Sequence, residues 1–201
     1  GTICDVVPLI GLNRAIVKQG LRILRSKKNL GLKVLTEICD INTHLSVYHI
    51  GYMIGPRINA GGRVGKSSHG ANLLMDNNAK NVYEIAIELD HSNKERQHLE
   101  KEVLDLVLSE LGDSVLDPVI IINRKNLHEG VIGIVASRIK DKFNKPVIII
   151  SLDDKIGKAS ARSIVGFDIG SVIISAVQEK ILIKGGGHKM AGGFSIKIEN
   201  I

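Results

Sequence analysis

The sequence predicts an α/β protein in which a long helix joins two bodies, and three segments carry this prediction. Residues 81–111 place apolar side chains at helical spacing near both ends, with the polar stretch 91–98 between them. Such a helix packs at its ends and is solvated in the middle, so we expect the domain boundary there. Residues 119–122, 128–143 and 146–150 then predict a strand, a helix and a strand, which at these lengths form a βαβ unit with parallel strands.

The N-terminal part of the chain predicts two helices. Residues 1–9 are mostly apolar and predict the end of a buried segment. Asn13 is expected to cap a helix over residues 14–29, with Gly31 as its C-terminal stop. A short second helix is expected over residues 32–38.

Two further stretches complete the expected secondary structure. Glycine and proline punctuate residues 54–65, which predicts a loop. In the C-terminal part, Asp168 is expected to cap a helix over residues 169–179. The alternation of residues 194–198 predicts a final strand.

Composition and charge narrow the class of protein. The chain of 201 residues has 27 Lys and Arg against 21 Asp and Glu, a net charge of +6, which favours a polyanionic partner. Aromatic residues make up only 3% and Trp is absent, so a nucleic acid would be held through its phosphates rather than by base stacking. Cys4 and Cys39 fit neither a metal-binding spacing nor a disulfide framework, which indicates a reducing compartment. Because there is also no apolar run of membrane-spanning length and no signal-peptide pattern, we expect a cytoplasmic protein that binds no membrane.

Two glycine-rich runs that each contain a histidine are the most informative feature of the sequence. They are H-E-G-V-I-G-I-V-A-S-R at 128–138 and G-G-G-H-K-M-A-G-G at 185–193, and each is expected where a strand passes into a helix. Glycine lets the backbone approach a ligand closely, and a helix start offers free N–H groups with a partial positive charge. Together the runs predict one anion pocket, although a locally capping histidine and a tight turn with an exposed histidine are the alternatives. The candidate groups are His128, Gly186, Gly187 and His188.

The run S-A-R-S at 160–163 supplies a second cluster. Along a strand, Ser160 and Arg162 point to the same side, where a hydroxyl and a guanidinium make a fork for phosphate. Ser163 follows directly and belongs to the same candidate site. The alternative is an ordinary exposed edge strand.

Two further candidate sites lie in the N-terminal part. Arg57 and Arg63 flank Asn59 in the predicted loop, where they could hold phosphates; helix capping and surface salt bridges explain them equally well. Asp5 lies among apolar neighbours, where a carboxylate is costly to bury unless it is paired or binds a metal. For Asp5 the alternative is a cap for the following turn.

These runs together resemble the RecJ family, single-stranded-DNA-specific exonucleases of the DHH phosphoesterase superfamily. G-T-I-C-D-V-V-P-L at 1–9 looks like the family's fourth catalytic motif, and G-P-R-I-N-A-G-G-R at 55–63 resembles its G-P-R-x-N-A-x-G-R loop. E-L-D-H-S-N-K-E-R-Q at 88–97 resembles the middle of its connecting helix. The three runs in the C-terminal part, described above, resemble the DHH-associated domain that binds the nucleic-acid strand.

The resemblance implies a domain order, an activity and roles for single residues. We expect the C-terminal part of a DHH catalytic domain at 1–80, a connecting helix at 81–111, and a DHH-associated substrate-binding domain with a mixed sheet at 112–201. The family hydrolyses single-stranded DNA from the 5′ end with Mn²⁺ or Mg²⁺, in DNA repair and recombination, so single-stranded DNA is the expected partner. Asp5 matches the metal-binding aspartate of the fourth motif and is the catalytic and metal-binding candidate. The phosphate-binding candidates are Arg57, Asn59, Arg63, His128, Ser160, Arg162, Ser163, Gly186, Gly187 and His188.

The chain departs from the family's pattern at both ends. The family's first three metal-binding motifs, including Asp-His-His, would precede residue 1, and its OB-fold would follow residue 201. Because a two-metal phosphoesterase needs several carboxylates and histidines, we expect a catalytically incomplete portion that binds the strand. Within the matched part, Leu127 and Val165 stand where many relatives have Trp and Pro. Two other interpretations stay open: a non-catalytic strand-binding module, and a DHH-type phosphodiesterase that acts on short oligonucleotides or cyclic dinucleotides.

Overall fold

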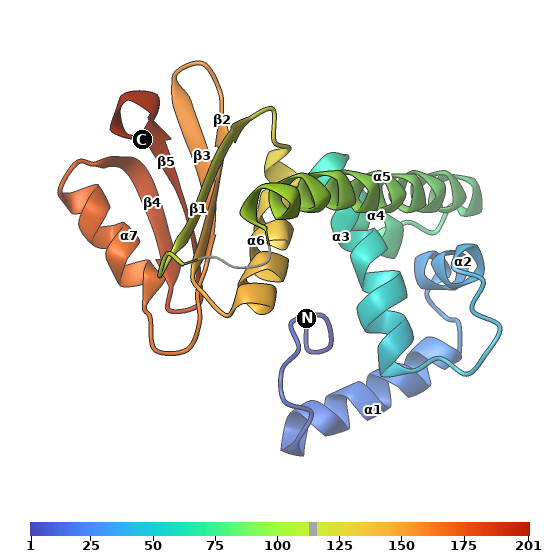
Figure 1. Ribbon diagram of the computed structural model, residues 1–201. Helices are drawn as coiled ribbons and strands as arrows, with labels where there is room; N and C mark the ends of the chain where they lie inside the picture. Colours follow the sequence, from blue (N-terminus) through green and yellow to red (C-terminus); the bar gives the residue numbers. More distant parts are fainter. Residues whose placement is uncertain (113–115) are drawn as a thin grey trace. The chain divides into compact units, whose positions relative to one another are not determined.

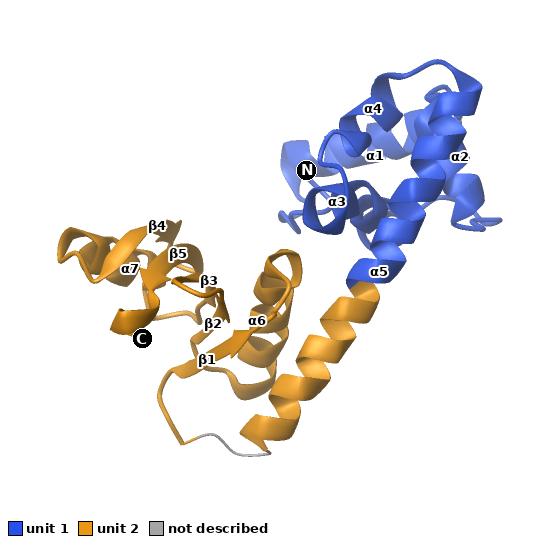
Figure 2. Ribbon diagram, turned by 90° about the horizontal axis from the view of Figure 1, so that it is seen from above, with its two compact units in different colours: residues 1–96 blue, residues 97–201 orange. Residues whose placement is uncertain are grey.

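The computed structural model describes residues 1–112 and 116–201, which form two compact units. Unit 1 comprises Gly1–Arg96 and unit 2 comprises Gln97–Ile201 (Figure 2). Helix α5 (Ala79–Leu111) is continuous and contributes residues to both units, as the sequence pattern predicted for a long helix. Among the described residues, no helix is both long enough and apolar enough to cross a membrane.

Unit 1 is helical in its described residues. Its elements are α1 (Gly11–Arg25), α2 (Leu30–Ile38), the π-helix η1 (His49–Ile54), α3 (Gly55–Val64), α4 (His69–Met75) and the first part of α5 (Figure 1). A common core holds them together, in which Leu35, Leu73 and Leu89 are fully buried. The expected helix over residues 32–38 is confirmed, since α2 comprises Leu30–Ile38.

The first helix has different ends from those that the sequence predicted. It begins at Gly11 rather than after Asn13, whose side-chain amide donates to the Pro8 carbonyl at 3.1 Å and caps nothing. It ends at Arg25 rather than at residue 29, and Asn29 instead caps α2 by accepting from the Leu32 N–H at 2.9 Å. The predicted stop at Gly31 is wrong because this glycine lies inside α2, where an added Cβ would come within 1.9 Å of the Leu73 carbonyl oxygen.

The predicted loop over residues 54–65 is also wrong, because these residues form α3 after the end of η1. Pro56 lies in the first turn of α3, a position at which proline is common. Two of the glycines serve close packing: a Cβ at Gly55 would lie 2.5 Å from Cys4 Sγ, and one at Gly61 would lie 2.7 Å from the Lys66 carbonyl oxygen. Glycine at these two positions reflects a lack of space rather than a turn.

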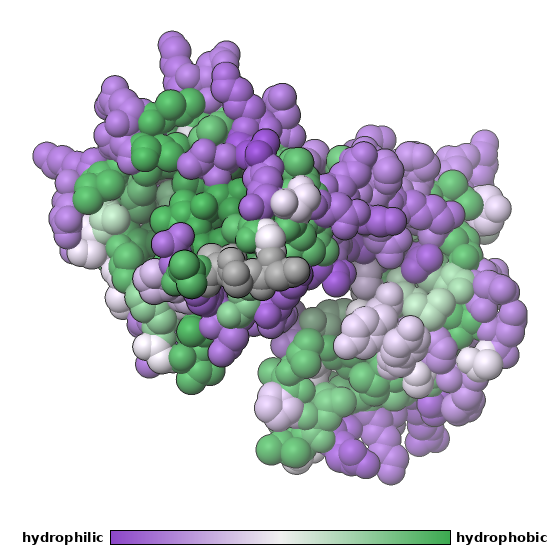
Figure 3. Space-filling view, viewed as in Figure 1, coloured by the Kyte–Doolittle hydropathy of each residue, from purple (hydrophilic) through white to green (hydrophobic). Residues whose placement is uncertain are grey.

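The N-terminal residues 1–9 are not the buried segment that their composition predicted. They form a turn in which the Asp5 N–H donates to the Gly1 carbonyl at 2.9 Å, and Val6 takes a left-handed φ of 53° with 84% of its surface exposed. Exposed apolar side chains continue onto α1 at Leu12 and Ile16. Figure 3, which has the same view as Figure 1, shows hydrophobic surface in the region of α1. An apolar run as short as this does not determine by itself whether other elements bury it.

The described part of unit 2 contains a five-stranded sheet with the order β1-β2-β3-β5-β4. The strands are β1 (Ile120–Lys125), β2 (Val147–Leu152), β3 (Ile156–Arg162), β4 (Leu182–His188) and β5 (Ala191–Lys197). β1 and β2 are parallel and joined through α6 (Glu129–Phe143), which confirms the βαβ unit, and all the other pairs are antiparallel. A second helix, α7 (Ile169–Gln178), precedes β4, and the short η2 (Ile198–Asn200) follows β5. The predicted α/β class with a mixed sheet is confirmed.

Helices α6 and α7 cover opposite faces of the sheet. Ile149 packs with the apolar side of α6, and the register places Ser160, Gly193 and Gly186 in line with it on the same face. On the other face, Ile173 of α7 packs against β4 and β5. This division leaves room beside α6, on its own face, over β3, β5 and β4.

The polar stretch in the middle of α5 contains the boundary between the two units but is not solvated throughout. Asn93 is 2% exposed and accepts a hydrogen bond from Arg96 at 2.8 Å. Slightly further along, in unit 2, the buried carboxylate of Glu100 pairs with Arg138 of α6. The expected solvated middle is confirmed for most of residues 91–98, which are exposed or half-buried, and Asn93 is the buried exception in this stretch.

Candidate nucleic-acid interface

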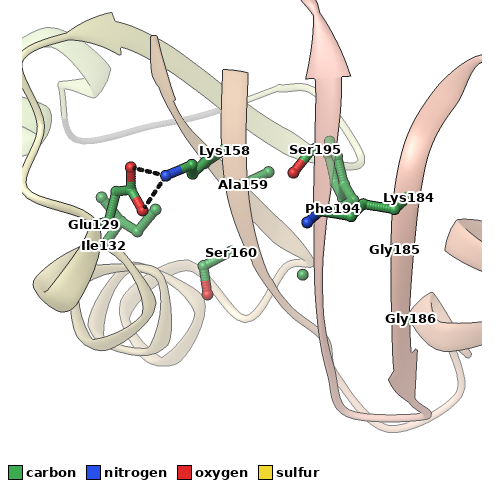
Figure 4. A pocket seen from close by; sticks show the side chains of 11 residues that line it. Glu129, Ile132, Lys158, Ala159, Ser160, Lys184, Gly185, Gly186, Phe194 and Ser195 are labelled. Carbon is green, nitrogen blue, oxygen red and sulfur yellow. Dashed lines mark hydrogen bonds and ion pairs between the residues drawn. The ribbon is translucent and has the colours of Figure 1, made fainter. Parts of the chain in front are cut away.

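A hollow of about 660 Å³ lies on the face of the sheet beside α6, and we call it the groove (Figure 4). Its sides come from the first turns of α6 and from β4, and its floor comes from β3 and β5. The polar and glycine residues that line it are Glu129, Lys158, Ser160, Lys184, Gly185, Gly186, Gly193 and Ser195. The elements that meet here come from segments far apart in the sequence.

The strand register explains the chemistry of the groove floor. Ser160 pairs with Gly193, and Gly193 pairs with Gly186, so one row across the three strands holds a hydroxyl and two positions without side chains. Two residues along, Lys158 pairs with Ser195, which pairs with Lys184. Because side chains alternate between faces, both rows lie on the same face. A Cβ added at Gly186 would meet no described atom within 4 Å, so the backbone there is open to a ligand.

The S-A-R-S cluster and the α6 run lie against each other. Arg162 donates to the Ser160 hydroxyl at 3.1 Å and, through Nε, to the Ser137 hydroxyl of α6 at 3.1 Å. Gly133 makes room for this arrangement, since a Cβ there would lie 2.8 Å from Ser160 Oγ and 2.9 Å from a guanidinium nitrogen of Arg162. The edge-strand alternative is wrong, because β3 is flanked by β2 and β5.

Ser163 lies apart from this cluster. It is 1% exposed, and its hydroxyl donates to the Phe167 carbonyl at 2.7 Å. Its N–H donates to the Met190 carbonyl at 2.9 Å. These bonds hold the connection after β3 in place, so the hydroxyl of Ser163 stabilises the fold and does not line the groove.

His128 is the N-cap residue of α6. Its Nδ1 accepts from the Gly130 N–H at 3.1 Å, which matches the local capping alternative. Because Nδ1 accepts, the neutral ring carries its proton on Nε2, and this exposed ring can still donate to an anion through Nε2. A capping role and an anion-binding role are therefore compatible at His128.

The run at 185–193 is a β-hairpin, and the expectation that a helix follows its strand is wrong. His188 pairs with Ala191, so Lys189 and Met190 make the turn directly into β5. The helix start that meets the hairpin is that of α7, where a Cβ at Gly170 would lie 2.9 Å from the backbone of His188. Gly187 packs within the hairpin, since a Cβ added there would lie 2.4 Å from the Ala191 carbonyl oxygen. Sequence spacing alone does not distinguish glycines at a transition from strand to helix from glycines in a β-hairpin.

The candidates of unit 1 lie on α3. The Nε of Arg57 donates to Asp90 Oδ1 at 2.8 Å, and its Nη1 donates to the Met53 carbonyl at 2.8 Å, so this guanidinium holds unit 1 together. Burial raises the pKa of Asp90, but hydrogen bonds from Lys94 and Arg57 outweigh burial and hold that pKa below its ordinary value. Two other candidates follow on the same helix: Asn59 is exposed, and Arg63, in its last turn, is half-buried.

The residues described here do not fit a metal centre by themselves. Within residues 1–112 and 116–201, no group of three or more His, Cys, Asp or Glu side chains is placed to hold a metal ion. Asp5 is exposed in the N-terminal turn rather than buried in an apolar environment. These residues therefore do not account for a hydrolytic step by themselves.

Sequence reasoning missed several residues of the groove, above all Lys158, Lys184 and Glu129. The Nζ of Lys158 lies 2.7 Å and 3.0 Å from the two carboxylate oxygens of Glu129, and this hydrogen bond and charge raise the pKa of Lys158 above its ordinary value. Alternation along β3 could have found Lys158, which lies two residues before Ser160. Glu129 could not be found in this way, because it belongs to another element.

Comparison with known proteins gives one consistent family. Residues 113–201 match the DHHA1 domain family. The whole chain is 36% identical to the single-stranded-DNA-specific exonuclease RecJ of Bacillus subtilis and covers 26% of that protein. It is 37% identical to RecJ of Haemophilus influenzae, again over the whole chain, and covers 36% of it. The chain thus spans about a quarter to a third of the length of these curated relatives.

Solved structures agree with the sequence comparison. The crystal structure of RecJ from Thermus thermophilus in complex with Mg²⁺ has a TM-score of 0.86 and 34% identity, over 97% of this chain and 30% of that one. The same protein in complex with Mn²⁺ has a TM-score of 0.86 at 35% identity, over 97% of this chain and 28% of that one. By sequence and by fold, the chain belongs to the RecJ family and carries a DHHA1 domain over residues 113–201.

Proposed function

We propose that the groove binds the sugar–phosphate backbone of single-stranded DNA and that this chain is the strand-holding portion of a RecJ-like 5′-to-3′ exonuclease. The observation that carries the proposal is the row of Ser160, Gly193 and Gly186, which is open to a ligand at Gly186 and is flanked by the two lysines of the next row. The names of the relatives, single-stranded-DNA-specific exonucleases, support the choice of ligand.

The chemistry of the groove suits a phosphodiester chain. Lysine ammonium groups and serine hydroxyls donate hydrogen bonds to phosphate oxygens, and residues two apart on a strand lie about 7 Å apart, which spaces such donors along a backbone. The glycine floor lets a sugar or phosphate approach the sheet without steric conflict. On this proposal Ser160 and Arg162 form one contact, and Lys158, Lys184, Gly186 and His188 line the path of the strand. The exposed Nε2 of His128 adds a donor at the start of α6.

Hydrolysis is assigned to the complete RecJ-like enzyme, in which Mn²⁺ or Mg²⁺ would activate the attacking water. We propose Asp5 as one carboxylate ligand there, and Asn59 and Arg63 as contacts to the strand in unit 1. Arg57 acts by pairing with Asp90, which fixes α3 against α5. Because one carboxylate does not hold two metal ions, we expect this chain by itself to bind DNA without cleaving it.

The sharpest test places a charge in the groove without disturbing the packing. Gly186 and Gly20 both have space for a Cβ, since neither would meet a described atom within 4 Å, and neither has a left-handed φ. Gly186→Glu should weaken binding to 5′-phosphorylated single-stranded DNA by at least about tenfold, because a carboxylate would face phosphates. Gly20→Glu adds the same charge on α1 and should change the affinity by less than about twofold. Fluorescence anisotropy over a range of salt concentrations measures both.

Three outcomes separate the possibilities. Salt-sensitive binding by the unsubstituted chain, lost in Gly186→Glu and kept in Gly20→Glu, supports the proposal. Equal losses in the two variants would remove the groove from the binding site. Cleavage by the chain in Mn²⁺ that survives purification and disappears in Asp5→Ala would contradict the catalytic part of the proposal.

A further inference from the structure

One side chain in the groove has the wrong charge for a phosphate-binding surface. Glu129 lies in the first turn of α6, and its two carboxylate oxygens hold the ammonium of Lys158 at 2.7 Å and 3.0 Å (Figure 4). Both residues line the groove. The position that a phosphate would take on Lys158 is therefore occupied by a carboxylate of the protein itself.

The exposure of both side chains makes it easy for another anion to replace Glu129 in this ion pair. The side chains of Lys158 and Glu129 are 59% and 55% exposed, and ion pairs of this kind are weak because water solvates both partners. The helix start stabilises an anion at this position, whether the anion is a carboxylate or a phosphate. A phosphodiester can thus replace Glu129 on Lys158, but it must compete with a partner that is always present.

We propose that Glu129 is an internal competitor of the DNA phosphate, which limits how tightly the groove holds a strand. The inference rests on the proposed function of the groove and adds a residue that sets its affinity. A carboxylate tethered beside Lys158 keeps this cation from contributing a full phosphate contact. A strand that moves through the groove would then be released from Lys158 by re-formation of the ion pair.

Removing the charge of Glu129 tests the inference. Glu129→Gln keeps the size of the side chain, and it should tighten binding to single-stranded DNA by roughly three- to tenfold at low salt. Each additional phosphate contact on a single strand steepens the dependence of log affinity on log salt by about 0.7, so the slope should increase by about this amount. In the double variant Glu129→Gln with Lys158→Gln, the gain in affinity should disappear.

The matched control is Glu110→Gln, which removes the same charge from another exposed ion pair of unit 2. Arg124 Nε donates to Glu110 Oε2 at 3.0 Å, and neither residue lines the groove. This control should leave the affinity within about twofold and the salt slope unchanged. Thermal unfolding of each variant checks that the fold is intact.

The outcomes distinguish this inference from the proposed function. If Gly186→Glu abolishes binding while Glu129→Gln leaves affinity and slope unchanged, the groove binds DNA and the competitor role of Glu129 is wrong. A gain that persists without Lys158 would show that Glu129 acts by general repulsion, which also overturns the inference. If the unsubstituted chain shows no salt-sensitive binding, the proposed function fails and this inference fails with it.

Discussion

The two faces of the β4–β5 hairpin carry the same residue type with opposite consequences. On the face toward α7, a Cβ at Gly185 would lie 2.8 Å from Ile173 Cγ2, and one at Gly192 would lie 2.5 Å from Ile173 Cδ1. On the groove face, Gly186 has no described atom within 4 Å of where its Cβ would be. Glycine thus makes room for a helix on one side and for a ligand on the other, and the alternation of the strand decides which glycine does which.

Gly185→Val should have the largest effect on stability in this comparison. The added side chain would collide with Ile173 and with the Cβ of Phe194, also at 2.8 Å, so we expect the free energy of unfolding to fall by about 1–3 kcal/mol. Gly186→Val is the matched control and should be neutral or slightly stabilising, because a β-branched residue suits a strand. Urea denaturation measures both, and similar losses at the two positions would contradict the division into a packed and an open face.

The two serines of the S-A-R-S run should also differ in their roles, one in the stability of the fold and the other in DNA binding. Ser163→Ala removes a buried donor to the Phe167 carbonyl and should lower the free energy of unfolding by about 1 kcal/mol, with DNA binding unchanged in the folded protein. Ser160→Ala should leave stability nearly unchanged and weaken DNA binding by roughly threefold. Calorimetry and anisotropy on both variants make the comparison. A stability loss from Ser160→Ala as large as that from Ser163→Ala would place both hydroxyls in the fold rather than one in the groove.

The smallest expected effect concerns pH and the helix that covers the packed face. Asp168 caps α7, and the hydrogen bond from the Ser171 N–H is the main reason why the pKa of its carboxyl lies below the ordinary value. The stabilisation from this cap is complete above the ordinary carboxyl pKa and is lost as the pH falls through the lowered pKa, which places the loss below about pH 4.

Asp168→Asn isolates this effect, because asparagine caps a helix without titrating. The difference in melting temperature between the unsubstituted chain and the variant should be constant above about pH 5 and should shift toward the variant in acid. Other carboxylates titrate in the same range, among them Asp90 in unit 1, and they cancel in this difference. A difference that stays constant down to about pH 3 would show that the charge of Asp168 contributes nothing to the cap.

Features that depend on neighbouring residues could be predicted from the sequence. The long helix, the βαβ unit and the Asp168 cap all follow from apolar periodicity or from one polar side chain next to a helix start. The shared side of Ser160 and Arg162 follows equally from alternation along one strand. Such patterns are local, because each is formed by the order of side chains within one element or within consecutive elements of the chain.

Features that depend on contact between distant segments were decided by the tertiary structure. The sequence predicted Gly186 as a candidate ligand contact and placed Gly55 and Gly133 in glycine-containing runs. Glycine, however, serves turns, close packing and ligand access alike. Only the fold shows that Gly133 makes room for Arg162 and that Gly186 opens onto the groove. Likewise Glu129 meets Lys158 across 29 residues of sequence, because the register of β3 and the start of α6 bring them together. Sequence spacing carries no information about that meeting, since it depends on how the helix packs on the sheet.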